Sequence, residues 1–228
     1  MFKTETHVHT LPVSSCSRKY PEEMVRLYHE AGYRTMFISD HFAQSHFRKL
    51  GEQMTFQDKV RLLYDSYLRA RCVGEQLGVN VLFSVELSLC ANHWLLYGID
   101  LDFLLLRSDI FEMTLEQFSI HAKAHGVTII QAHPLRDGHN TPHPEIADGF
   151  EIINSNPRHE NYDDQVFALA KKYHLLMSAG SDAHRDEDIA GTAMLSENEI
   201  RTVDDYLALL KSGKAKLMRN GEIKWSGF

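Results

Sequence analysis

Two short pairs of side chains, at opposite ends of the chain, have the chemical types and the spacing of metal ligands. His7 and His9 are separated by one residue, and Asp182 and His184 have the same spacing near the other end. In an extended segment, residues at positions i and i+2 point to the same side. Residues 178–181 are small, which allows the backbone to lie close to another group. Because hard or borderline metal ions accept imidazole and carboxylate groups, the two pairs indicate one shared metal centre.

Apolar strands and helices alternate along the sequence, and they must position these residues. We expect strands at residues 2–6, 35–39, 79–85, 95–99, 127–131, 150–153 and 175–178, and helices at residues 21–31, 55–77, 114–125, 162–173 and 203–210. Residues 214–218 and 222–225 are expected to form a final hairpin. Strand–helix alternation predicts a parallel sheet with helices outside it. The strands therefore predict an α/β fold, a distorted or incompletely closed seven-stranded (β/α) barrel.

Polar residues follow directly after most of the predicted strands. This set contains His7, Asp40, His41, Glu86, His133, Asn154 and Asp182. Active sites of parallel barrels and open sheets lie at the carboxyl ends of their strands. We therefore expect these side chains to gather at one end of the barrel.

Together, these motifs resemble those of the PHP family, named for polymerase and histidinol phosphatase. Five segments occur in the family's order: His7-Val8-His9-Thr10, Ile38-Ser39-Asp40-His41, Ser84-Val85-Glu86-Leu87-Ser88, Ala132-His133-Pro134 and Gly180-Ser181-Asp182-Ala183-His184. The resemblance covers roughly residues 1–195. It implies a seven-stranded β/α barrel, a site with two or three divalent metal ions, and hydrolysis of a phosphoester.

The resemblance also implies roles for particular residues. The implied metal ligands are His7, His9, His41, Glu86, His93, His133, Asp182 and His184. Glu86 is implied to bridge two ions, and Asp40 is expected to orient His41. Glu86, Asp182 and His184 are the candidate catalytic residues. Many family members carry a His or Asp soon after the first motif, whereas residues 12–16 here read Pro-Val-Ser-Ser-Cys, so the ligand at one metal position stays open.

The ligand types define the expected chemistry. Imidazoles and carboxylates suit Zn, Mn or Fe ions, and adjacent ions lower the pKa of a bridging water and clamp the oxygens of a phosphoester. Because this water supplies the nucleophile, Cys16 is not expected to do so. Arg136 and Arg158 are candidate substrate-binding residues, since a guanidinium group can fork onto phosphate oxygens. Asn154 could either bind substrate or cap a turn.

These residues predict a metal-dependent phosphatase or phosphoesterase. We expect it to hydrolyse a small phosphorylated metabolite, similar to histidinol phosphate, or a short nucleotide, by attack of a metal-bound hydroxide. One alternative is a metal-dependent amidohydrolase, which would usually have a lysine at a strand end; none occurs at the expected place. The other is a non-catalytic, metal-stabilised module that binds a partner.

The composition limits the remaining possibilities. The chain has 228 residues, 43% hydrophobic and 24% charged, which suits a single soluble domain spanning residues 1–228. No apolar run is long enough to span a bilayer and no apolar signal segment opens the sequence, so we expect a cytoplasmic protein without a membrane partner. Its 3 cysteines argue against a disulfide framework, and its net charge of -7 argues against strong binding to duplex nucleic acid. A short oligonucleotide substrate stays open.

Overall fold

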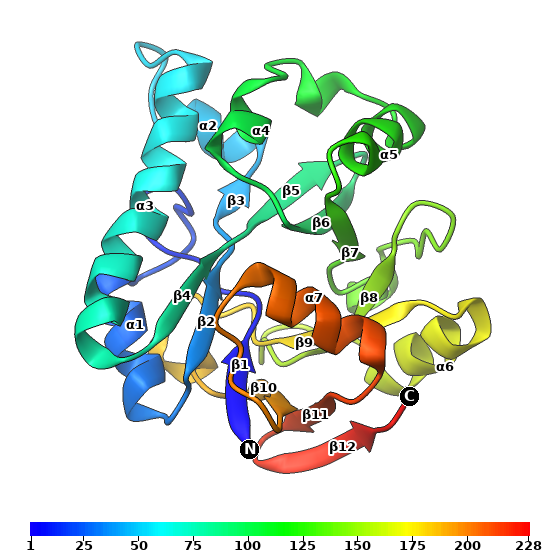
Figure 1. The fold of residues 1–228 in the computed structure, drawn as a ribbon. Helices are drawn as coiled ribbons and strands as arrows, with labels where there is room; N and C mark the ends of the chain where they lie inside the picture. Colours follow the sequence, from blue (N-terminus) through cyan, green and yellow to red (C-terminus); the bar gives the residue numbers. More distant parts are fainter.

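The strands of the protein form two six-stranded sheets, shown in Figure 1 for the computed structural model, which describes residues 1–228. In spatial order, the first sheet contains β12 (Glu222–Ser226), β11 (Lys216–Arg219), β10 (Thr192–Ser196), β1 (Phe2–Glu5), β2 (Thr35–Ile38) and β4 (Asn80–Phe83). The second contains β3 (His41–Phe42), β5 (Val85–Leu89), β6 (Asn92–Tyr97), β7 (Thr128–Gln131), β8 (Gly149–Asn154) and β9 (Leu176–Gly180).

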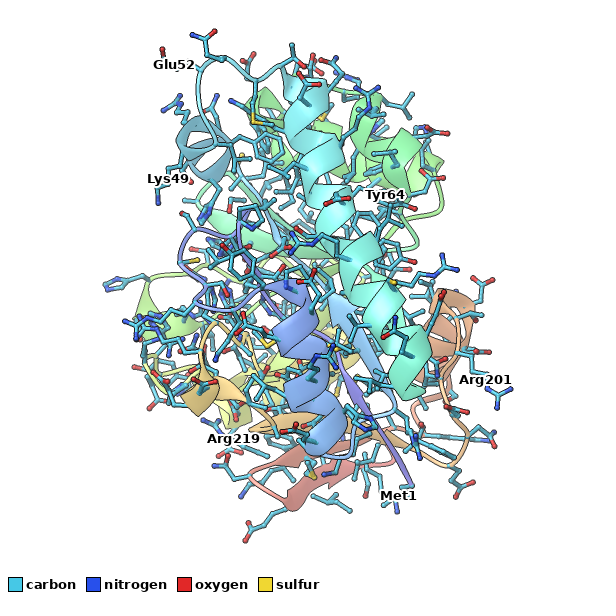
Figure 2. All side chains as sticks on the ribbon, turned by 90° about the vertical axis from the view of Figure 1, so that its left-hand side faces the viewer. Met1, Lys49, Glu52, Tyr64, Arg201 and Arg219 are labelled. Carbon is cyan, nitrogen blue, oxygen red and sulfur yellow. The ribbon has the colours of Figure 1, made fainter.

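Helices surround these sheets. They are α1 (Pro21–Glu30), α2 (Gln44–Lys49), α3 (Phe56–Leu77), α4 (Leu101–Leu105), α5 (Leu115–Ala124), α6 (Asp163–Tyr173) and α7 (Val203–Ser212), with single 3-10 turns at Ile110–Glu112, Arg136–Gly138 and Asp186–Asp188. The long helix α3 begins where Thr55 and Asp58 exchange hydrogen bonds, and ends at Gly78, whose φ is +71°. Figure 2 shows α3 facing the viewer beside α1.

The two helices on this side are joined by an ion pair and by apolar packing. The guanidinium of Arg69 donates hydrogen bonds of 2.7 and 3.0 Å to the carboxylate of Glu22. The apolar sides of α1 and α3 pack with β2 and β4 in a cluster of 15 buried side chains. This layer holds the first sheet against the loop that carries His7 and His9.

A closed, parallel seven-stranded barrel is not confirmed, because both sheets are mixed and remain open. Strand β6 runs antiparallel to β5 and to β7, and β1 runs antiparallel to β10. The reason lies in a tight turn at Cys90 and Ala91, both with positive φ, which reverses the chain without a crossover helix. Strand β10 was not predicted, whereas the hairpin of β11 and β12 was, and it is present.

Two strands of the first sheet continue directly into the second. The chain passes from β2 to β3 at Ser39 and Asp40, and from β4 to β5 at Ser84. The backbone N–H of Ser84 donates to the carbonyl of Ile38 at 3.0 Å, so the two transitions lie side by side. The predicted single strand at residues 79–85 is therefore two strands, and Glu86 lies inside β5 instead of after a strand end.

The main core lies between the second sheet and the outer helices. It contains 41 buried side chains, which come from strands of both sheets and from helices α2 to α7. No helix of the structure combines the length and the apolar character needed to cross a membrane.

Candidate metal centre

The backbone brings the two ligand pairs together. Val8, between the first two histidines, forms a parallel bridge with Ala183, between Asp182 and His184. As a result, His9 Nε2 lies 3.1 Å from Asp182 Oδ1, and His184 Nδ1 lies 3.5 Å from the same oxygen. The side chains of both pairs thus face one another, as their spacing predicted.

A glycine makes this approach possible. A Cβ atom built on Gly180 would lie 2.5 Å from Cβ of His7 and 2.6 Å from Oε1 of Glu151. Such distances are shorter than van der Waals contact, so a larger residue would push β9 away from the first pair of histidines. The small residues before Asp182 therefore allow the close approach that the sequence predicted.

Glu86 lies at the centre of the histidines. Its Oε1 atom is 3.4 Å from His7 Nε2, 3.0 Å from His93 Nδ1 and 3.0 Å from His133 Nε2. Its Oε2 atom is 2.6 Å from His41 Nδ1 and 3.5 Å from His9 Nε2. The two oxygens of one buried carboxylate thus face two groups of imidazoles, which is the arrangement a bridging carboxylate needs.

The separations between donor atoms fit divalent ions. Donor atoms around a tetrahedral ion with bonds of 2.0–2.1 Å lie about 3.3 Å apart. The donor atoms of His7, His9, Glu86 and Asp182 are separated by 2.9 to 3.6 Å. His41 Nδ1 and Glu86 Oε2 are both buried and lack a hydrogen-bond partner, although they face each other. Buried polar atoms without partners are rare, and an ion between these groups would satisfy them.

Hydrogen bonds at the second ring nitrogen orient several of the histidines. His7 Nδ1 lies 2.9 Å from Glu151 Oε1, and His184 Nδ1 lies 2.8 Å from the carbonyl oxygen of Asp182. A proton on these Nδ1 atoms leaves Nε2 with a free lone pair, which is the state that a metal ligand requires. Glu151 also accepts hydrogen bonds from the backbone N–H of His133 and from Asn154. It therefore positions candidate ligands that follow two different strands, β1 and β7.

Glu151 and Glu5 were missed by the sequence analysis. Both are fully or almost fully buried acids, Glu5 at the end of β1 and Glu151 within β8, and Glu5 accepts hydrogen bonds from the backbone N–H groups of Thr6, His7 and Ser181. A carboxylate on the buried side of a predicted strand is the signal that could have found them, because a buried acid without a partner is costly.

Asp40 supports the site differently from the prediction. Its carboxylate accepts hydrogen bonds from the backbone and hydroxyl groups of Thr10 and from the hydroxyl of Ser14, and it makes no hydrogen bond to the ring of His41. Ser14 in turn accepts a hydrogen bond from the backbone N–H of His41 and lies 3.4 Å from His9 Nδ1. Asp40 therefore acts on the two histidines through Ser14.

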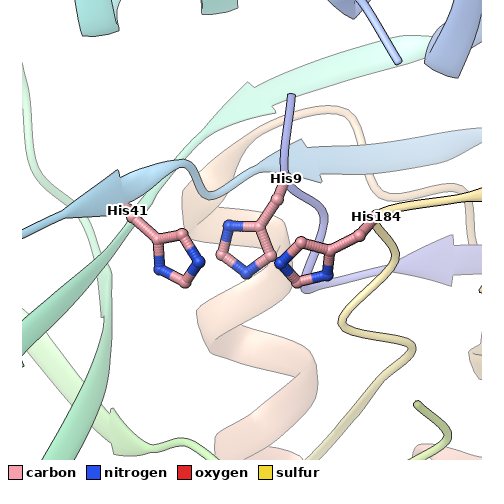
Figure 3. A group of neighbouring side chains, drawn as sticks. All are labelled: His9, His41 and His184. Atoms are coloured by element: carbon pink, nitrogen blue, oxygen red, sulfur yellow. The ribbon is translucent and has the colours of Figure 1, made fainter. Parts of the chain in front are cut away.

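Three histidines stack against one another in the centre, shown in Figure 3. The ring centroid of His9 lies 4.0 Å from that of His41 and 4.4 Å from that of His184. One ring nitrogen from each of the three lies within 4.8 Å of the others. These residues come from three segments that are far apart in the sequence.

The electrostatics of the site suit the binding of cations. Burial opposes ionisation of Glu86 and Asp182, but nearby histidines, together with Arg136 for Asp182, hold the pKa of both carboxyl groups well below their usual range. Burial and Arg136 lower the pKa of His133 to about 4, which keeps this ring neutral. Burial opposes protonation of His41 as well, yet Glu86 raises its pKa to about 10. The carboxylates therefore attract positive charge, which divalent ions would supply.

Two of the candidate ligands have backbone angles that are uncommon for their residue types. His133 has a φ of +32° and Asp182 a φ of +53°. Such conformations cost on the order of 1–3 kcal/mol and concentrate at functional sites. Each residue lies two positions after the end of a strand, β7 for His133 and β9 for Asp182.

A cavity of about 180 Å³ opens beside the centre. It is lined by Cys16, His41, His93, Arg136, Asn156, Arg158, His159, Asp182, His184 and Arg185. Arg136 lies 2.5 Å from Asp182 and donates to Asn154 at 3.0 Å, while Arg158 makes two hydrogen bonds to the buried Asp188. Both predicted arginines therefore line the cavity, where Asp182 holds Arg136 and Asp188 holds Arg158.

Asn154 and Cys16 lie differently with respect to the cavity. Asn154 is fully buried behind Arg136, so it positions this arginine and does not line the cavity. Cys16 is an exposed residue, but its side chain lines the cavity next to His41 and His184. Burial opposes ionisation of this thiol, yet hydrogen bonds with the two imidazoles bring its pKa to about 6.

Comparison with known proteins agrees with this picture. A family model described as PHP-associated matches residues 162–215, whereas no curated protein matches the sequence. Among solved structures, a two-domain protein from Bacteroides vulgatus that contains a predicted PHP-like metal-dependent phosphoesterase has a TM-score of 0.67 and 16% identity. The alignment covers 96% of this chain and 64% of that protein.

Two further structures have the same fold. The lesion-specific endonuclease PfuEndoQ from Pyrococcus furiosus has a TM-score of 0.64 and 15% identity, with 95% of this chain and 57% of the endonuclease covered. An amidohydrolase from Chromobacterium violaceum, solved with sulfate and no metal, has a TM-score of 0.54 and 14% identity, with 95% and 97% covered. This chain thus spans less than two thirds of the length of the Bacteroides vulgatus protein and of the endonuclease.

The fold and the cluster define a mixed α/β protein with a histidine–carboxylate centre suited to divalent metal ions. The shared fold and the PHP-associated segment confirm the resemblance to the PHP family that the five motifs predicted.

Proposed function

We propose that this protein is a metal-dependent phosphoesterase that hydrolyses a phosphoester of a small phosphorylated metabolite, similar to histidinol phosphate, or of a short nucleotide. The observation that carries the proposal is the position of Glu86, whose two carboxylate oxygens lie within 3.5 Å of ring nitrogens from five histidines. This arrangement suits two or three ions of Zn, Mn or Fe. Asp182 adds a second carboxylate to the same cluster.

When bound, such ions would activate a water molecule and stabilise charge on the phosphoryl oxygens. The chain itself would position the substrate. Arg136 and Arg158 offer planar donors for phosphate oxygens at the cavity wall. Asp182 and His184 lie at the same wall, where they are placed to accept the proton that the attacking water loses.

We also propose that residues 1–228 act as one domain. The main core cluster combines Val13, near the beginning of the chain, with Tyr206, Leu210 and Leu217 near its end. Strands β10 to β12 extend the sheet that contains β1, so the last segment is part of the same layer. A domain of this kind should unfold in one cooperative step.

The test is a panel of phosphorylated substrates with protein reconstituted with Zn, Mn or Fe. We expect metal-dependent release of phosphate from at least one phosphomonoester, and its loss in Glu86→Gln, because glutamine has one acceptor oxygen and no charge. Glu75→Gln, at an exposed acid of α3, is the matched control and should keep full activity. Near-normal turnover in Glu86→Gln would contradict the bridging role.

Amide substrates added to the panel separate the two alternatives. Cleavage of amides without release of phosphate would identify an amidohydrolase, the class named for one of the structures with this fold. No lysine lines the cavity, which favours the phosphoesterase. Stoichiometric metal binding without turnover of any substrate would indicate a metal-stabilised binding module.

A further inference from the structure

Cys16 and His46 lie at the open side of the metal centre, and the proposed reaction does not use them. Cys16 belongs to the loop between β1 and α1, and His46 belongs to α2. The sulfur of Cys16 and ring nitrogens of His41 and His46 all lie within 4.8 Å of one another. One thiol and two imidazoles form a ligand set of the kind that binds zinc.

Local hydrogen bonds hold this loop in place. The hydroxyl of Ser17 donates to the carbonyl of His9 at 3.0 Å, and the hydroxyl of Ser14 donates to Asp40 at 2.7 Å. Cys16 lies between these two anchored serines. These hydrogen bonds anchor the backbone on both sides of Cys16.

His46 is oriented toward the same place. Its Nδ1 atom lies 3.3 Å from the carbonyl oxygen of Val13, which leaves Nε2 with a free lone pair when Nδ1 carries the proton. The rings of His41 and His46 are 4.3 Å apart between centroids. The loop that carries Cys16 thus also orients the histidine opposite.

His41 joins this cluster to the Glu86 centre, because its Nδ1 atom faces Glu86 Oε2 at 2.6 Å while the ring also lies beside Cys16. This residue is only 8% exposed, and its Nδ1 atom has no hydrogen-bond partner. A buried ring nitrogen without a partner costs free energy unless a cation or a donor satisfies it. His41 therefore lies between the Glu86 carboxylate and Cys16, where it can bind an ion at the edge of the Glu86 centre.

We propose that Cys16, His41 and His46 bind a zinc-class ion through one sulfur and two nitrogen atoms, at a site adjacent to the Glu86 centre. The thiol loses its proton to the solvent and Sγ donates a lone pair to the ion, so no electron is transferred. This proposal does not depend on the proposed reaction.

Cobalt(II) binding to the full chain tests the sulfur ligand without any activity measurement. We expect a near-ultraviolet thiolate-to-cobalt charge-transfer band in the wild type and in the control variants Cys72→Ser and Cys90→Ser, which alter the other two exposed cysteines. The band should be absent in Cys16→Ser. A wild type without the band, or a band that survives in Cys16→Ser, would overturn the proposal.

Zinc content and X-ray absorption provide the second measurement. Zinc-loaded wild type should show a sulfur neighbour at about 2.3 Å. His46→Ala and Cys16→Ser should each bind about one zinc equivalent less than the wild type, while Cys16→His should restore that equivalent without the charge-transfer band. Unchanged stoichiometry in both loss variants would overturn the site. If Cys16→Ser fails to fold, an X-ray absorption spectrum of the zinc-loaded wild type that lacks a sulfur neighbour would by itself overturn the proposal.

Discussion

Val8 and Ala183 form a parallel β-bridge, in which His9 N–H donates to the carbonyl of Ala183 at 3.0 Å. Each of the two residues lies between the members of a ligand pair. The bridge therefore fixes the distance between the pairs through the backbone, before any metal binds. The approach depends on the absence of a side chain at Gly180.

We expect Gly180→Ala to weaken metal binding. The added methyl group would meet Cβ of His7 and Oε1 of Glu151 at 2.5 and 2.6 Å, which should destabilise the fold by about 1–3 kcal/mol and separate the ligand pairs. Gly149→Ala is the matched control, because its Cβ would be equally crowded, at 2.5 Å from Ile130 and Leu176. Gly149 lies at the start of β8, whereas Gly180 pairs with Asn154 at the end of that strand. Calorimetric metal titration and chemical denaturation should show a loss of affinity only in Gly180→Ala. Equal affinity in both variants would contradict the prediction.

Glu151→Gln should lower metal affinity about 10- to 100-fold. The carboxylate accepts hydrogen bonds from His7, His133 and Asn154, whereas an amide has only one acceptor oxygen. Glu145→Gln changes an exposed acid that pairs with His143 and serves as the control. Competition with a chromophoric chelator measures the affinity. A change below about two-fold in Glu151→Gln would show that Glu151 does not orient His7.

Arg136→Ala should lower kcat/KM for a phosphoester about ten- to a hundred-fold, the effect of losing roughly 1.5–3 kcal/mol from a charge-assisted contact. Arg136→Lys should recover only part, because a point charge cannot make two parallel hydrogen bonds. The control Arg107→Ala removes an exposed arginine that pairs with Asp109.

Metal content must be measured together with these rates, since Arg136 also lies 2.5 Å from Asp182. A loss of turnover at unchanged metal content supports substrate binding by Arg136. Loss of metal in Arg136→Ala would instead assign this arginine to the positioning of Asp182, and unchanged kcat/KM would remove it from the site.

Glu5→Gln should change how stability depends on pH in chelator-treated protein. Burial raises the pKa of Glu5 from 4.5 to about 7, although three backbone N–H groups oppose this shift. The folded state therefore retains a proton that the unfolded state releases, and the stability contributed by Glu5 decreases as pH rises between these values. The unfolding free energy of wild type relative to Glu5→Gln should fall by about 2.5 kcal/mol between about pH 5 and about pH 8. Parallel urea-denaturation profiles of the two proteins would contradict it.

The sequence by itself determined the local features of the site. The i, i+2 spacing identifies His7, His9, Asp182 and His184, because strand geometry places alternate side chains on one side wherever the strand lies. The small residues that end at Ser181 predicted a close backbone approach for the same local reason. Helix α3 and the final hairpin were also predicted, since caps and turn residues act over a few positions.

Only the tertiary structure decided which distant side chains meet. Glu86 reaches five histidines because the chain leaves the first sheet after β4 and enters the second sheet with β5, at Ser84. No local sequence pattern encodes this change of sheet. The reversal between β5 and β6, which makes the sheet mixed, depends equally on long-range pairing. Glu151 contacts His7 across 144 positions, and Cys16 lies beside His41 because a serine-anchored loop places it there. Residue types and spacing set the chemistry that each strand can offer, whereas strand pairing and packing set the distances between strands, and those distances make a metal centre.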